Sequence, residues 1–127
     1  EGAGKTVVRS GEMYPNHPCC VLVVSGSLIR EHPEIVEQII KTHLKAIDYI
    51  EKNPDDAAAI YAEKTSSNLE DVKLSLREWD GSFNADPDLI VDPVMDYATI
   101  QYNLGYIKKQ LTQDEVFDLS FYKKATS

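Results

Sequence analysis

Four side chains near the start of the sequence could hold a ligand or take part in chemistry: Glu12, Tyr14, His17 and Cys19. Three of them lie within, and the fourth directly follows, the proline-braced segment from Ser10 to Pro18 (SGEMYPNHP). Polar and aromatic groups on such a loop beside a sheet are a common way to build a ligand site. A plain surface connection is the other interpretation of the same residues, and the sequence leaves both open.

The adjacent cysteines Cys19 and Cys20 suggest a different chemistry, that of a thiol nucleophile. A nucleophilic cysteine needs a neighbouring base, and His17 precedes Cys19 by two residues, on the same face of a regular strand. No glycine-rich oxyanion loop and no third orienting group accompany the pair, and unreactive thiols are common in protein cores. We therefore assign no catalytic residue and keep a small cysteine-dependent enzyme as an alternative only.

Phosphate, metal and cofactor sites find little support. The tripeptide GKT at residues 4–6 imitates the end of a phosphate-binding P-loop, but that motif needs a helix directly after the lysine, and two valines follow instead. The histidines His17, His32 and His43 share no spacing that would form a metal site. We expect no metal ion and no cofactor.

Composition narrows the class of protein. The chain has 127 residues, is 43% hydrophobic, and carries 21 acidic against 13 basic residues, for a net charge of -8. This is typical of one globular domain or a piece of one. No apolar run approaches the roughly 20 residues of a membrane helix, and scattered bases argue against a nucleic-acid partner. Because the sequence starts at Glu1 without Met or a signal-like segment, we expect a removed targeting segment or an internal fragment.

Two β-favouring runs flank the candidate loop, at residues 5–9 (KTVVR) and residues 19–25 (CCVLVVS). The second run is apolar on both faces, and such a strand normally lies inside a sheet that helices cover on both sides. The chain offers only one other strand candidate. We therefore predict that the neighbouring strands of residues 19–25 come from other polypeptide.

From Ser27 onward the hydrophobic period is helical. The clearest helix is predicted at residues 33–52, which open with a proline and an acid and carry isoleucines along one face. A second helix is predicted from Pro54 to about Lys64, with Asn53 as its cap. A capping box of Ser67 and Glu70 predicts a third helix. A further helix is predicted to start at Asp92 and Pro93, with an apolar stripe from Tyr97 to Leu111. A second capping box, of Thr112 and Glu115, precedes a short final turn.

Several of these pieces, in this order, resemble a known family. They are a Pro-Cys-Cys strand (PCCVLVVS), HPE at a long helix start, KAIDYIEKNPDDAA at the next junction, and LGYIKK before a phenylalanine-containing end. Together they are similar to the C-terminal part of periplasmic substrate-binding proteins of ABC importers in the nitrate, sulfonate and taurine group, which also includes binders of thiamine precursors. The resemblance covers nearly the whole chain.

The resemblance implies an α/β fold in which this chain is a helix-rich partial lobe of a type II periplasmic binding protein, with two short strands followed by four to five helices. Residues 1–18 would be an end strand of the second lobe and a hinge-proximal loop. Residues 19–127 would be the C-terminal part of the first lobe. Residues 19–25 would then lie in a sheet, and finding them exposed to solvent would remove the physical support for the assignment.

The resemblance also implies a function. Such a protein closes two lobes on a small solute, such as nitrate, a sulfonate or taurine, and delivers it to the permease subunits of an ABC importer without making or breaking bonds. It would work outside the cytoplasm, in the periplasm or anchored by lipid at the cell surface. Within this family the ligand-binding candidates would be Glu12, Tyr14, His17 and Cys19, although a carboxylate at Glu12 suits a cationic solute better than an anion.

Two further expectations follow from the sequence. A partial lobe with an open strand edge should self-associate, because an exposed edge is a template for pairing. The main alternative to solute binding is a free-standing helical module that exposes an apolar groove to a partner helix.

Overall fold

The computed structural model describes residues 4–15, 17 and 20–127, and its regular elements within these residues are all helices. The helices are α1 (Ser10–Met13), α2 (Gly26–Glu31), α3 (Pro33–Lys52), α4 (Pro54–Thr65), α5 (Leu69–Glu78), the 3-10 helix η1 (Pro87–Leu89), α6 (Val91–Asn103), α7 (Gln113–Val116) and α8 (Ser120–Thr126). The prediction of a helix-rich chain is therefore confirmed. The described part has more and shorter helices than the four to five expected.

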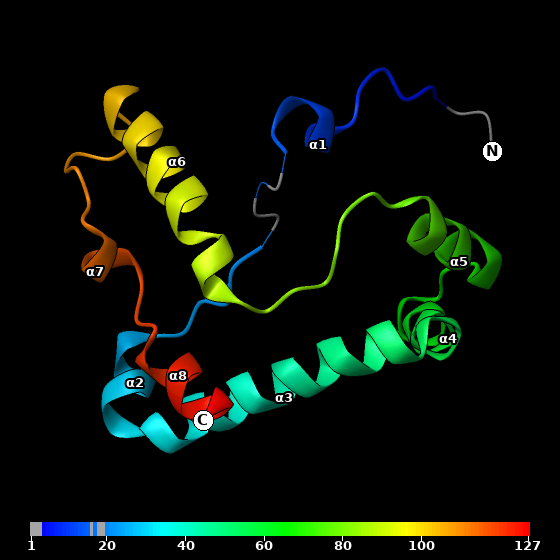
Figure 1. Ribbon diagram of the computed structural model, residues 1–127, viewed down its shortest axis with the longest axis horizontal. Coiled ribbons are helices and arrows are strands. Elements are labelled where there is room, and N and C mark those ends of the chain that lie inside the picture. The colour runs from blue at the N-terminus through cyan, green and yellow to red at the C-terminus, as the bar shows by residue number, and fades with distance from the viewer. Residues whose placement is uncertain (1–3, 16, 18–19) are drawn as a thin grey trace.

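Helix α3 is the longest described helix, with α2 and α8 at one end and α4 and α5 at the other, whereas α1 and most of α6 lie away from it (Figure 1). Helices α2 and α8 pack against α3 near its start, whereas α4 follows its C-terminal end and carries α5 beside it. A coil of residues 79–86 then leads to η1 and α6, whose closest helical neighbour is η1. The described chain thus has two small helix clusters joined by α3.

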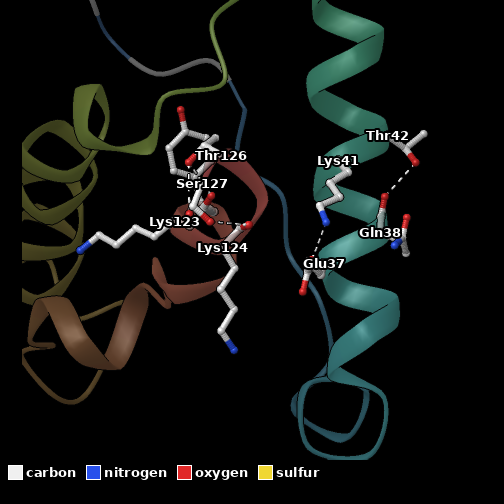
Figure 2. Close-up of polar contacts among 9 residues, drawn as sticks. Glu37, Gln38, Lys41, Thr42, Lys123, Lys124, Thr126 and Ser127 are labelled. Carbon is white, nitrogen blue, oxygen red and sulfur yellow. Dashed lines mark hydrogen bonds and ion pairs between the residues drawn. The ribbon is translucent and has the colours of Figure 1, made fainter.

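The C-terminal helix α8 folds back on α3 and completes the first cluster. Val36 on α3 is 2% exposed and Phe121 on α8 is 8% exposed. Charged side chains border this contact: Lys41 donates a hydrogen bond to Glu37 at 2.6 Å along α3, and Figure 2 shows both beside the end of α8. Lys124 of α8 lies 5.8 Å from the centre of the Phe121 ring, within reach of a cation–π contact.

The pair of Glu37 and Lys41 predicts a dependence on pH. The hydrogen bond from Lys41 is the main cause that lowers the pKa of Glu37, and the charges of Lys41 and Lys124 act in the same direction. Because the folded state lowers this pKa, the stabilisation is present above the pKa of the unfolded carboxyl and is lost as pH falls through the folded pKa. We expect Lys41→Gln to raise the Glu37 pKa, measured by NMR titration.

Lys45 supplies the matched control, since it lies one turn further along α3 and is exposed. Lys45→Gln removes the same charge and should leave the Glu37 pKa lower than that of the Lys41→Gln variant. Equal Glu37 pKa values in the two variants would contradict the assignment of the hydrogen bond as the main cause.

The chain exposes far more surface than a compact protein of its mass. Its accessible surface is 9992 Å², whereas a compact monomer of 14.3 kDa should expose about 6,800 Å². Tyr97 and Ile100 on α6 and Leu104 at its C-cap, for example, are all more than half exposed. The buried apolar side chains among the described residues are Val36, Ala58, Ala62 and Phe121. Large apolar faces therefore have no covering layer within the described chain.

The two predicted strands are not formed in the part of the chain that the structure describes. Residues 5–9 and 20–25 run as coil, and Cys19 lies outside the described residues. Val21 to Val24 make no hydrogen bond with the rest of the described chain, and Val23 is 79% exposed. A strand needs a partner to form its ladder, and no other described segment offers one. The physical support expected from burial of residues 19–25 is therefore missing.

The helix α5 begins with a different cap from the one predicted. The side-chain oxygen of Asn68 accepts hydrogen bonds from the backbone N–H groups of Glu70 at 2.9 Å and Asp71 at 3.1 Å. The Ser67 hydroxyl instead lies 2.8 Å from the hydroxyl of Thr65, so the predicted capping box of Ser67 and Glu70 is wrong. Asparagine is as good an N-cap as serine, and the sequence places the two residues side by side.

These two neighbours allow a direct test of the cap. We expect Asn68→Ala to lower the free energy of unfolding by about 1 kcal/mol, because two N–H groups in the first turn of α5 lose their acceptor. Ser67→Ala should change it by less than about 0.5 kcal/mol. Chemical denaturation of both variants measures the difference. A larger loss of stability in Ser67→Ala than in Asn68→Ala would mean that Ser67 is the cap after all.

The predicted start of α4 is confirmed in position but not in its cap. Asn53 occupies the N-cap position, yet its side chain donates to the Tyr49 carbonyl at 3.1 Å and so closes the end of α3. The Tyr49 hydroxyl in turn donates to Asp56 in the first turn of α4. This hydrogen bond is the main cause that raises the pKa of Tyr49. Polar contacts at this corner therefore fix the angle between α3 and α4.

The apolar stripe from Tyr97 to Leu111 does not lie on one helix. Helix α6 stops at Asn103 because Gly105 adopts a left-handed φ of 78°. The N–H of Tyr106 donates to the Gln101 carbonyl at 3.0 Å, which is the hydrogen bond of a Schellman motif. The capping box predicted before α7 is confirmed, with Glu115 accepting from the N–H of Thr112 at 3.0 Å.

Candidate functional site

The predicted site residues belong to one short turn of helix and the chain that follows it. We call residues 10–15 and 17 the ligand segment; it begins with α1, where a loop was predicted. Glu12 has an internal role there, because its Oε1 accepts a hydrogen bond from the backbone N–H of Arg9 at 3.0 Å. The carboxylate of Glu12 therefore caps the first turn of α1 and is already partly satisfied.

Tyr14 and His17 are brought together by two hydrogen bonds. The N–H of His17 donates to the Tyr14 carbonyl at 3.2 Å, and the Nδ1 of its ring lies 2.7 Å from the same oxygen. A carbonyl can only accept, so this contact places the ring proton on Nδ1 and leaves Nε2 as the acceptor. Both side chains are exposed, and Tyr14 is 68% exposed. The turn can thus present a phenol and an imidazole acceptor to a ligand.

The fourth predicted residue, Cys19, lies outside the described residues, so its place in the site remains a prediction. The proposed pairing of His17 with a thiol is untested for the same reason. Cys20 is described and is exposed.

No group of three or more metal-ligating side chains comes together within residues 4–15, 17 and 20–127. His32 lies 3.4 Å from Glu34 at the start of α3, and both side chains are exposed. His43 is exposed on α3.

Sequence reasoning missed the residue that ties the ligand segment to the rest of the molecule. Arg9 extends its side chain to the end of α5, where Nη1 donates to the Glu78 carbonyl at 2.6 Å. The same nitrogen lies 3.8 Å from a carboxylate oxygen of Asp80. No local sequence signal points to this contact, because its partners are about seventy residues away.

A large pocket of the described chain lies away from the ligand segment. It is a groove of about 1000 Å³ between the C-terminal half of α3, α4 and α5, closed at one side by Phe83. Its wall is mainly alanine, isoleucine and tyrosine, with Lys64 and Asp71 among its few charged residues. None of the described ligand-segment residues lines it. This groove suits the packing of an apolar surface better than the binding of a small polar solute.

Comparison with known proteins assigns the chain to a family. The NMT1-like family matches residues 1–64, and the chain belongs to it. A protein of Bacillus subtilis (strain 168) named "Putative aliphatic sulfonates-binding protein" is 25% identical over 122 residues, which are 96% of this chain and 37% of that relative. The chain thus spans less than two fifths of the length of this relative. No solved structure gives a significant match.

These comparisons confirm the resemblance to substrate-binding proteins of the nitrate and sulfonate group. The helix-rich structure is consistent with part of a lobe of such a protein. The assignment rests on sequence similarity, since residues 20–25 are not buried in a sheet in this chain. Within the described residues, no helix is both long and apolar enough to cross a bilayer.

Proposed function

We propose that this chain is part of the solute-binding component of an ABC-type importer, which binds a small anionic solute such as a sulfonate, nitrate or taurine and passes it to a membrane permease. The observation that carries the proposal is membership of the NMT1-like family together with the sulfonate-binding name of the Bacillus relative. The protein would act outside the cytoplasm, in the periplasm or lipid-anchored at the cell surface. It would bind and release its solute unchanged and would not be an enzyme.

The role of Glu12 supports an anionic solute. A free carboxylate in the cleft would repel an anion, but the Glu12 carboxylate accepts a hydrogen bond from the backbone at the start of α1. The hydroxyl of Tyr14 can then donate a hydrogen bond to an anion, whereas Nε2 of His17, the acceptor of the neutral ring, could donate only in the imidazolium form. Cys19 completes the set of residues that we propose for ligand contact.

The proposed place of the chain in the binding protein explains its open surface. Residues 1–18 would form the end strand and hinge-proximal loop of the second lobe, and residues 19–127 the C-terminal part of the first lobe. The chain exposes about 3,000 Å² more than a compact monomer of its mass, whereas one side of a standard protein interface covers about 800 Å². The excess exposed surface is therefore large enough to be covered by a whole layer of polypeptide, and it is larger than a single partner contact would cover.

In the same arrangement, residues 19–25 would become a central strand of the first lobe. The apolar side chains of Val21 and Leu22 are about half exposed in this chain, and the backbone groups of Val21 to Val24 form no hydrogen bond with other described residues. This placement therefore requires that strands from outside the chain pair with the segment and cover its side chains in the complete protein.

When the chain stands alone, the same segment should drive self-association. The backbone groups of Val21 to Val24 have no hydrogen-bond partner among the described residues, and such groups are a template for pairing with a second copy. Light scattering coupled to size-exclusion chromatography should therefore show species larger than the monomer. A purely monomeric chain across a wide concentration range would contradict this part of the proposal.

The proposed function is tested by a thermal-shift screen of the complete protein. Nitrate, taurine, alkyl sulfonates and pyrimidines should be compared, because a ligand that prefers the folded state raises the melting temperature. We expect a rise that grows with concentration for at least one sulfonate or related anion. A rise in melting temperature with pyrimidines alone would mean that the solute is a pyrimidine and not an anion of this kind. No rise with any of these compounds would contradict the proposal that the protein binds a solute of this group.

A second candidate function is a helical interaction module, and the apolar groove of α3, α4 and α5 is the observation that favours it. A module of this kind would hold a partner helix in the groove. The two functions differ in one measurable respect: the module would give no melting-temperature rise with small solutes, whereas the binding protein would.

A further inference from the structure

Arg9 joins the ligand segment to a helix that lies 69 residues further along the chain. Its Nη1 donates to the carbonyl of Glu78, the last residue of α5, and lies 3.8 Å from Asp80. The last carbonyls of a helix lack partners within the helix and form the negative end of its dipole. A guanidinium placed there makes a charge-assisted hydrogen bond, which is stronger than a neutral one.

The backbone of Arg9 is hydrogen-bonded to the first turn of the ligand segment. The N–H of Arg9 donates to the Glu12 carboxylate at 3.0 Å, and its carbonyl accepts from the N–H of Glu12 at 3.1 Å. A β-carbon added at Gly11 would lie 3.5 Å from a carboxylate oxygen of Asp80, so α1 lies directly against the residue that Arg9 pairs with. A helix of four residues is not stable by itself and needs such contacts to keep its place.

We propose that Arg9 is a positioning residue for the ligand segment: by pairing with Glu78 and Asp80 it fixes where Tyr14 and His17 lie, without touching the ligand. The part of this inference that concerns ligand affinity rests on the proposed function. The part that concerns the placement of the segment does not, because it follows from the contacts of Arg9 alone.

The test compares Arg9→Gln with Lys5→Gln in the complete protein. Lys5 is exposed and forms no hydrogen bond or ion pair with the described residues, so both variants lose one positive charge from the same stretch, but only one loses the anchor. Amide hydrogen exchange, followed by mass spectrometry without ligand, should be about tenfold faster over residues 10–14 in Arg9→Gln and unchanged in Lys5→Gln. Arg9→Lys should restore part of the protection, because lysine keeps the charge and can still donate to the Glu78 carbonyl.

The second measurement is the affinity for ethanesulfonate. Arg9→Gln should weaken it about tenfold, the scale of a lost hydrogen bond from a charged group. Asp80→Asn should weaken it less, since it removes the ion pair and keeps the hydrogen bond to Glu78. Lys5→Gln should leave it unchanged.

Each contrary result overturns the inference in a distinct way. Unchanged exchange in Arg9→Gln would show that the side chain does not hold the segment. Weaker binding with unchanged exchange would mean that Arg9 touches the ligand itself. Equal losses of exchange protection and affinity in Lys5→Gln would show that the loss of one positive charge, and not the loss of the anchor, causes the effect. If the unaltered protein does not bind ethanesulfonate, the proposed sulfonate binding fails, and the exchange experiment alone decides the placement of the segment.

Discussion

Replacing Phe121 by alanine is expected to lower the free energy of unfolding by about 3 kcal/mol, the lower end of the range for a buried phenylalanine. Phe121 is 8% exposed and is the buried anchor of α8 on α3. Val36, the most buried side chain of α3 at 2% exposure, belongs to the same cluster. With few side chains buried in the described chain, the loss of one of them should weaken the whole cluster.

An exposed aromatic residue gives the control for this substitution. Tyr106 is 75% exposed beyond the end of α6, so Tyr106→Ala should change the free energy of unfolding by less than about 0.5 kcal/mol. Chemical denaturation of the two variants compares the losses directly. Similar losses would mean that the contact of α8 with α3 does not stabilise the protein.

Replacing Leu22 by aspartate is expected to have opposite consequences in the isolated chain and in the complete protein. In the isolated chain Leu22 is 52% exposed, and the substitution should change the free energy of unfolding by less than about 0.5 kcal/mol. In the complete protein the residue would lie in a sheet covered on both faces. An unpaired carboxylate buried there should cost about 4 kcal/mol.

The matched control is Leu22→Ile, which keeps the volume and apolar character of the side chain. It should cost less than about 1.5 kcal/mol even in a packed sheet. If Leu22→Asp is harmless in the complete protein as well, residues 19–25 are not a buried strand, and the proposed place of the chain in a lobe is wrong.

The helices were the part of the fold that the sequence predicts best. Helix α3 occupies the predicted residues 33–52, because a proline in the first turn and a regular apolar stripe are local signals. The start of α4 at Pro54 follows from the same kind of signal. Boundaries that depend on one residue were less predictable: Asn68 rather than Ser67 caps α5, and Gly105 ends α6 before the apolar stripe does.

The strands were not predictable in the same way, because a strand is not a local structure. The β-favouring composition of residues 5–9 and 19–25 describes what these segments could do in a sheet, but the hydrogen bonds of a sheet come from neighbouring strands. Within the described residues there is no such neighbour, and Val21 to Val24 stay exposed or half-buried coil.

The candidate site was partly predictable for a similar reason. The types and spacing of Glu12, Tyr14 and His17 indicate a turn that carries polar groups, and the structure brings Tyr14 and His17 into contact. The capping role of Glu12 depends on α1, a single helical turn with weak sequence signals. The anchoring role of Arg9 depends on a partner at the far end of α5, which only the folded chain reveals.

In the proposed lobe, residues 19–25 form an inner strand. The most direct test is amide hydrogen exchange at Val21 to Val24 in the complete protein, resolved residue by residue by NMR. We expect these amides to exchange at least about a thousandfold more slowly than in an unstructured peptide, because only large-scale opening would expose them. Exchange at the unstructured rate would show that the segment has no strand partners there, and would contradict its place as an inner strand of a solute-binding lobe.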